Sequence, residues 1–310
     1  MFDNHIQLGD PVEFRGIVVA PLFPRNDPKT EYLTLEEALP LGFRITELDA
    51  AGSVPELLAF NPLDTRVLLY DGEELLGAKQ NRILNVTVLA AAKSETRIPV
   101  SCVEQGRWHA HSASFESARH AAYPDLRRRK AEQLSAEPLA PGAAQAAVWD
   151  EVAAKAGRHG VHSPTGAAAD IYRSRDDALS ELRHAFPLAA GQSGALLALG
   201  DEQLCLDYVS RPLAFARLYP KLLDGYLLDG LDHLNRKPAN QDRVVDFASA
   251  IATLPQRRSA SAGVGEDLRI AGTGVVGSGL IVDEEVLQLS VFTSDGSGPR
   301  TRVARPSRRR

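Results

Sequence analysis

One pattern recurs three times along the chain and limits the folds open to it: an apolar run, a tight acidic turn and a second apolar run. The copies lie at residues 68–76, 197–205 and 280–287. Each copy predicts a β-hairpin, because short apolar segments joined by turn residues pair across the turn. The Asp71-Gly72 turn gives the strongest signal, since glycine adopts a positive φ without steric cost. Three hairpins predict sheets that are largely antiparallel.

The rest of the chain changes between blocks of strand and blocks of helix. Residues 14–110 contain β-branched runs bounded by Gly, Pro, Asn and Asp, which predict strands. Residues 113–186 and 212–254 have helical spacing, with two strands between them, and residues 268–293 return to strand composition. This order, without a regular βαβ alternation, predicts an α+β fold with antiparallel strands at both ends and a helical middle.

Two short segments in the first block, residues 34–39 and 54–60, predict single helical turns. In the first of them Thr34 is the expected N-cap, and Glu37 occupies the position that completes a capping box.

We expect a single α+β domain over residues 1–293, in which the last strands pair back with the N-terminal ones. A sub-boundary near residues 135–145, which are rich in Pro and Ala, is the alternative. Residues 294–310 are expected to form a flexible arginine-rich tail, whose removal leaves the fold intact. The two cysteines, Cys102 and Cys205, are too few for a disulfide framework and predict buried thiols.

Charge is unevenly distributed. The formal net charge is −5, but the last eleven residues carry six arginines and no acid, so residues 1–299 carry −11. An acidic body repels nucleic-acid phosphates, and we expect nucleic-acid binding only through the tail. The N-terminus lacks the features of a secretory signal, and no segment has the roughly 20 apolar residues of a membrane-spanning helix. We therefore expect a cytoplasmic protein without a membrane partner.

The segment from Gly72 to Trp108 is the most informative for function. Two apolar strands, at 83–90 and 97–103, close on a loop around 91–95. If their alternating apolar residues share the core face, paired residue numbers must sum to an even value, and a sum of 186 gives a five-residue loop. This register pairs Leu84 with Cys102, Val86 with Val100, Val88 with Ile98, and Arg82 with Glu104.

Polar residues gather at the end of this predicted hairpin. An arginine fork, amides, a lysine and an indole are what recognition of an anionic, planar ligand such as a nucleotide requires. The alternative is an ordinary cross-strand ion pair, contributing roughly 0.2–1 kcal/mol, with a polar rim around it. The candidate ligand-binding residues are Glu73, Lys79, Gln80, Asn81, Arg82, Glu104, Gln105, Arg107 and Trp108. Glu74 belongs to the same polar cluster.

The same segment carries a family resemblance. GEELLGAKQNRILNVTVLAAAKSETRIPVSCVEQGRW resembles the hallmark region of the ARG and rhodanese-phosphatase-superfamily-associated protein domain, and the likeness covers most of residues 10–293. The resemblance implies a genomic association with ADP-ribosylglycohydrolases and rhodanese-like phosphatases. It implies no established activity. It favours ADP-ribose or another nucleotide derivative as the ligand. The nine polar residues match as motif members without catalytic roles, and the arginine tail departs from the family pattern.

Three functions stay open. The first is a binding or accessory module for a nucleotide-like ligand, such as an ADP-ribose derivative. The second is a hydrolase for such a ligand, with Glu73 or Glu104 as general base and Arg82, Arg107 or Lys79 stabilising developing charge. The third is a structural or interaction protein in which these residues only hold the sheet.

No cofactor and no metal are predicted. His109, His111 and His120 lack a matching carboxylate or cysteine arrangement for a metal site. The glycines from Gly272 to Gly277 match a dinucleotide fingerprint literally, but a strand follows them where the fingerprint needs a helix.

Overall fold

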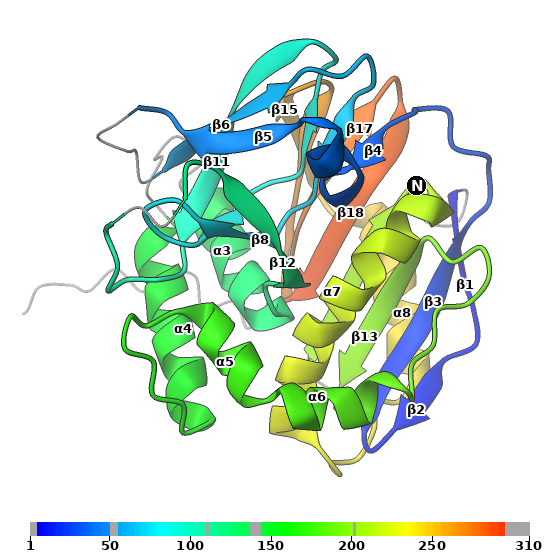
Figure 1. Cartoon of the computed structure of the whole chain (residues 1–310). Helices are drawn as coiled ribbons and strands as arrows, with labels where there is room; N and C mark the ends of the chain where they lie inside the picture. The colour runs from blue at the N-terminus through cyan, green and yellow to red at the C-terminus, as the bar shows by residue number, and fades with distance from the viewer. Residues whose placement is uncertain (1–4, 50–54, 110–111, 137–143, 201–202, 295–310) are drawn as a thin grey trace, which may run out of the picture.

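The computed structural model describes residues 5–49, 55–109, 112–136, 144–200 and 203–294. The predicted α+β fold is confirmed, and Figure 1 shows how the strands and helices are arranged. The predicted arginine-rich tail, residues 294–310, lies outside the described residues except for Ser294, and most of the 135–145 stretch lies outside them as well. Within the described part of the chain, no helix combines the length and apolar composition needed to cross a membrane.

The largest sheet has nine strands, and every pairing in it is antiparallel. Its strand order is β1-β3-β13-β14-β18-β17-β16-β15, with β2 also pairing with β3. N-terminal and C-terminal strands therefore share one sheet, although β13 and β14 separate them. The strands are β1 (Ile6–Leu8), β2 (Val12–Phe14), β3 (Ile17–Pro24), β13 (Gly194–Leu199), β14 (Gln203–Val209), β15 (Gln256–Ala260), β16 (Glu266–Gly272), β17 (Val275–Val282) and β18 (Glu285–Thr293).

Two smaller sheets lie above it. A six-stranded antiparallel sheet has the order β12-β8-β9-β11-β6-β5, and a three-stranded sheet has the order β10-β7-β4 with one parallel pair, β4 and β7. The strands are β4 (Leu33–Thr34), β5 (Arg44–Glu47), β6 (Glu56–Asn61), β7 (Val67–Leu69), β8 (Glu73–Gly77), β9 (Arg82–Leu84), β10 (Val88–Ala90), β11 (Ser94–Cys102) and β12 (Phe115–Ala121).

Helices cover both faces of the large sheet. Alternating residues of β3 point to opposite sides, so Ile17 and Val19 join the core under α7, and Val18 and Leu22 join the core under α8. Figure 1 shows α7 running alongside β13, with β3 on the far side of that strand. The helices are α2 (Leu35–Ala38), α3 (Pro124–Ala136), α4 (Gln145–Arg158), α5 (Ala168–Ser174), α6 (Asp176–Arg183), α7 (Pro212–Gly230) and α8 (Gln241–Ala250), with the 3-10 turns η1 (Leu39–Leu41), η2 (Leu231–His233) and η3 (Ile251–Thr253).

Two of the three predicted hairpins are confirmed, β13–β14 and β17–β18. The first is wrong, because β7 and β8 belong to different sheets. Its turn does form, since Gly72 has a φ of +84° and the N–H of Glu73 donates to the carbonyl of Tyr70. The N–H of Gly72 donates to Leu84, however, and its carbonyl accepts from Ala122. These bonds tie the turn to neighbouring segments, and β8 continues between β9 and β12.

Local helix signals gave mixed results. The capping box of Thr34 and Glu37 is present at the start of α2, as predicted. The helical turn predicted at 54–60 is wrong, because Glu56–Asn61 form strand β6 with alternate side chains buried. The helical interpretation of residues 113–186 missed β12, and β15 was also missed.

A buried polar centre joins the layers. The guanidinium of Arg127 on α3 donates to both oxygens of Asp207 on β14, at 2.7 and 2.8 Å, and both residues are fully buried. Hydroxyls of Tyr70, Tyr226 and Ser290 donate to the same carboxylate at 2.7 Å. Burial raises the pKa of Asp207, but Arg127 and the hydroxyls outweigh burial and lower it to about 2.

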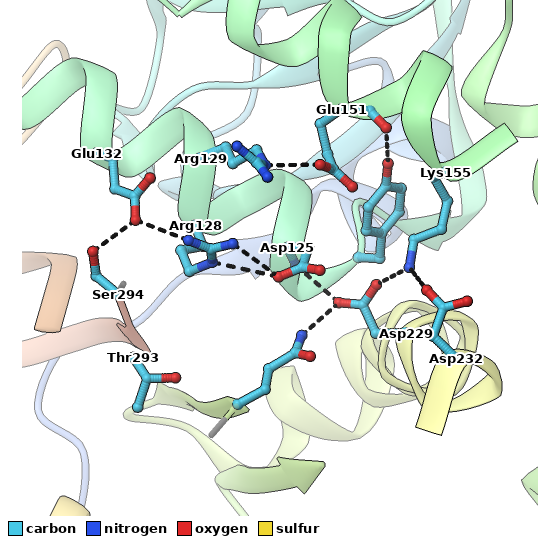
Figure 2. Close-up of polar contacts among 12 residues, drawn as sticks. Asp125, Arg128, Arg129, Glu132, Glu151, Lys155, Asp229, Asp232, Thr293 and Ser294 are labelled. Atoms are coloured by element: carbon cyan, nitrogen blue, oxygen red, sulfur yellow. Dashed lines mark hydrogen bonds and ion pairs between the residues drawn. The ribbon is translucent and has the colours of Figure 1, made fainter. Parts of the chain in front are cut away.

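A second charged network holds α4 against α7 and η2, and Figure 2 shows its members pointing toward one another. Nζ of Lys155 lies 2.6 Å from Asp229 and 2.7 Å from Asp232. One turn earlier on the same side of α4, Glu151 pairs with Arg129 of α3 at 2.7 Å. These contacts fix the end of α4, from which the chain turns toward α5.

Candidate functional site

The predicted polar cluster is built around a buried ion pair between Arg107 and Glu104, whose closest atoms are 2.6 Å apart. Arg107 Nε donates to Glu104. Its two terminal nitrogens donate to four oxygens, which belong to Gly77, Ala78, Asn81 and His109. An arginine has five N–H donors, and each of these has a protein partner. Arg107 therefore braces the turn between β8 and β9 and keeps no free donor for a ligand.

Glu104 is equally committed. One carboxylate oxygen accepts from the N–H of Asn81 at 3.1 Å, and the other accepts from the hydroxyl of Thr165 at 3.0 Å. Burial raises the pKa of Glu104, but hydrogen bonds from Arg107, Asn81 and Thr165 outweigh burial and hold the pKa below its usual value. A carboxylate held in its charged form by several donors is a weak general base, so this geometry favours a structural role for Glu104.

The strand register differs from the predicted one by two residues. Val100 pairs with Leu84, and Cys102 pairs with Arg82, so the paired numbers sum to 184. The predicted contact of Arg82 with Glu104 is therefore wrong. The even sum is confirmed, because the apolar residues of both strands share one core.

The predicted pairings of Val86 and Val88 are also wrong. The ladder ends where the N–H of Asn85 donates to the carbonyl of Pro99, a residue that has no N–H to return. Beyond that point β10 pairs with β7, and the first part of β11 pairs with β6.

Arg82 is fully buried, and Nη1 donates to the side-chain oxygen of Gln80 at 2.9 Å. Nε and Nη2 have no hydrogen-bond partner among the described residues, and burial lowers the pKa of Arg82. The guanidinium lies 5.7 Å from the ring centre of Trp108, and the ammonium of Lys79 lies 5.4 Å from the same centre. Trp108, which is 47% exposed, and the exposed Gln105 are the most exposed members of the cluster.

Glu73 contacts a different part of the molecule. Its carboxylate accepts from the N–H of Tyr70 at 3.0 Å and from Nζ of Lys221 on α7 at 3.3 Å. Lys221 also donates to the hydroxyl of Ser117 at 2.7 Å. Because Glu73 is buried and bonded on both oxygens, its environment resembles that of Glu104.

The adjacent Glu74 leads to residues that the sequence analysis did not assemble. Oε2 of Glu74, which is 1% exposed, lies 2.8 Å from Nε2 of His120 on β12. A carboxylate only accepts hydrogen bonds, so Nε2 of His120 is the donor in this contact. The His120 ring stacks on Tyr172 of α5, with ring centres 3.8 Å apart. Glu74 and Tyr172 thereby fix the orientation of the imidazole.

His120 and Tyr172 form the floor of a cleft of about 600 Å³, here called the β12 cleft. Figure 1 shows α5 and α6 below the end of β12, with α7 beside them. Apolar walls are supplied by Leu76, Ala169 and Leu179, and the polar lining is supplied by Arg119, His120, Tyr172, Arg173, Asp176, Arg183 and Asp224.

The cations of the cleft differ in how they are paired. Arg183 contacts both oxygens of Asp224, at 2.6 and 3.1 Å, and Arg173 contacts Asp170 at 2.6 Å. Arg119 is exposed and forms no ion pair with any residue that the structure describes. The lining of the β12 cleft therefore includes one uncommitted guanidinium and one oriented imidazole. These groups can bind an anion, and the imidazole can also accept a proton.

No local signal in the sequence joins Glu74 to His120, because 46 positions separate them and β12 falls inside a predicted helical block. Both cysteines are buried free thiols, as predicted. Within the described ranges no group of three or more His, Cys, Asp or Glu side chains could hold a metal ion.

The fold and this cleft define an α+β protein with a polar, mixed-charge cleft between a sheet edge and three helices. The chain belongs to the ARG and Rhodanese-Phosphatase-superfamily-associated Protein domain family, whose model matches residues 5–292. No curated protein and no solved structure matches it.

Proposed function

We propose that this protein is a binding or accessory module that recognises an anionic, nucleotide-like ligand in the β12 cleft. One observation carries the proposal: the unpaired guanidinium of Arg119 lines the same cleft as the imidazole of His120, which Glu74 holds in place. A guanidinium and an imidazole are common partners of phosphate oxygens. The cleft volume of about 600 Å³ lies within the range of small-molecule sites.

An ADP-ribose derivative is the first ligand to test. The family name links its members to ADP-ribosylglycohydrolases, which favours this class of compound. The polar and apolar lining of the cleft suits a ligand that combines phosphate with a ribose or base. We assign the cluster around Arg107 a bracing role, with Gln105 and Trp108 as its exposed members.

A hydrolase acting on the same ligand is the second candidate, and the contact of Glu74 with His120 favours it. A buried carboxylate that fixes the tautomer of an imidazole leaves the other ring nitrogen as a general base. Nδ1 of His120 accepts no hydrogen bond from the described residues. Arg119 would then stabilise charge that develops on the reacting phosphate or leaving group.

Calorimetric titration with ADP-ribose, ADP and AMP tests the binding proposal. We expect binding to weaken at least roughly tenfold in Arg119→Ala, because a charge-assisted contact to phosphate is lost. Arg257→Ala is the matched control, since Arg257 is an exposed arginine on the edge strand β15 of the large sheet and does not line the cleft. Equal binding by the two variants, or no binding by the natural chain, would contradict the proposal.

Turnover separates the two candidates. Incubation of ADP-ribose with substoichiometric protein, followed by chromatography of the products, detects hydrolysis. Product formation that His120→Gln abolishes supports the hydrolase, and binding without product supports the accessory module.

A further inference from the structure

A second cavity, of about 460 Å³, adjoins the β12 cleft. It lies between the end of α4 and helix α5. Its side chains with basic groups are His159, His162, Arg173 and Arg175. Arg173 lines both the second cavity and the β12 cleft, so the two hollows share this residue.

The charge of the second cavity is one-sided. Asp170 is the carboxylate in its lining, and its two oxygens are already bonded to Arg173 and to the hydroxyl of Ser163, each at 2.6 Å. His162 is exposed, and the described residues give it no hydrogen bond or ion pair. The open donors of this cavity therefore suit an anion.

Two of the basic groups are held in position by their neighbours. Nη2 of Arg175 donates to the carbonyl of His159, and Nε of Arg175 is buried without a hydrogen-bond partner among the described residues. Nε2 of His159 lies 3.2 Å from Asp232, which Lys155 in turn contacts. Figure 2 shows Lys155 beside Asp232, at the end of the network that fixes α4. The cavity is therefore built on a rigid support.

We infer that the second cavity is a subsite for an additional anionic group of the ligand that occupies the β12 cleft. The ligand class is then a compound with two or more phosphate groups, such as a nucleoside diphosphate or a diphosphate-linked sugar, in preference to a monophosphate. This inference rests on the proposed function, because it assumes that the β12 cleft holds one end of the ligand.

The ratio of AMP to ADP-ribose dissociation constants tests the inference. In the natural chain we expect ADP-ribose to bind at least roughly tenfold more tightly than AMP, because the second cavity adds a charge-assisted contact. His162→Gln should lower this preference at least threefold and leave AMP affinity unchanged. Arg119→Ala should weaken both ligands and preserve their ratio.

His162 is a suitable position because it is exposed, so its substitution leaves the core unchanged. Arg175→Lys provides a second variant, which keeps the charge but loses the fork geometry, and it should also reduce the preference. Equal affinity for AMP and ADP-ribose, or a preference that survives both substitutions, would overturn the subsite and leave the proposed function standing. Absence of binding for both ligands would overturn both proposals.

Discussion

Nε2 of His120 lies 2.8 Å from Oε2 of Glu74, across the pairing of strands β12 and β8. Removing the imidazole leaves a buried carboxylate without its partner. We expect His120→Ala to lower the free energy of unfolding by about 3 kcal/mol, the scale for breaking a buried pair. Urea unfolding measures this loss. The double variant Glu74→Gln with His120→Ala should recover part of it, since the uncompensated charge is gone. If the double variant loses as much free energy of unfolding as His120→Ala alone, the packing of His120 on Tyr172 contributes more than the contact with Glu74.

The bracing role of Arg107 gives a second prediction. Arg107→Ala removes five hydrogen bonds and leaves Glu104 buried without its cation. We expect a loss of at least about 3 kcal/mol in the free energy of unfolding. Gln105→Ala, at an exposed neighbouring position, should change it by less than about 0.5 kcal/mol. Comparable stability of the two variants in urea would remove the bracing role.

Acid should weaken the polar centre around Asp207. Its pKa falls from 3.8 to about 2 on folding, so the protein gains stability from this charge above about pH 4 and loses it as pH falls toward 2. The shift corresponds to about 2 kcal/mol. Tyr226→Phe removes one donor to this carboxylate and should therefore destabilise by about 1–2 kcal/mol at pH 7, and by less near pH 2.

Tyr219→Phe is the matched control for this pH dependence. The hydroxyl of Tyr219 donates to a backbone carbonyl, that of Phe186, and Tyr219 is also buried. The decrease in the free energy of unfolding that Tyr219→Phe causes should be independent of pH between 2 and 7. Parallel pH curves for the two variants would mean that the Asp207 charge contributes nothing through Tyr226.

Gly72 lies where the backbone and a buried arginine meet. Its φ is +84°, and an added Cβ would stand 2.7 Å from the side chain of Arg127. Gly160 has a φ of +61° and open space at the same place. Both substitutions to alanine carry a conformational cost of about 1 kcal/mol, and Gly72→Ala should lose a further 1–3 kcal/mol, roughly, from overpacking. Thermal unfolding of both variants checks the difference, and equal losses would contradict the close approach.

Short-range signals predicted much of the fold. The β13–β14 and β17–β18 hairpins and the Thr34–Glu37 capping box all form between residues close in sequence. The Asp71-Gly72 turn carried an equally strong signal, yet its strands separate. Asp71 bonds to Lys130 and Tyr70 bonds to Asp207, and both partners come from distant segments. Local turn chemistry fixes the bend of the chain and does not decide which strands pair after it.

The candidate site was less accessible to sequence reasoning for the same reason. The alternation of apolar residues correctly required paired residue numbers with an even sum, but a register shifted by two residues satisfies the same requirement. With this shift, the partner of Glu104 is Arg107 and not Arg82. The cleft joins Glu74 to His120 and Tyr172 across three elements. Such convergence depends on tertiary packing, which periodicity in one sequence does not encode.

The position of β14 between β13 and β18 has a consequence for biosynthesis. One edge of β14 pairs with β13, which precedes it in the chain, whereas the other edge pairs with residues 288–292, roughly 80 residues further along. During translation this edge therefore stays open until β18 has left the ribosome. An open edge is a template for pairing with other chains. Premature termination before β18 should thus yield aggregation-prone fragments. A chaperone that covers strand edges should suppress their aggregation.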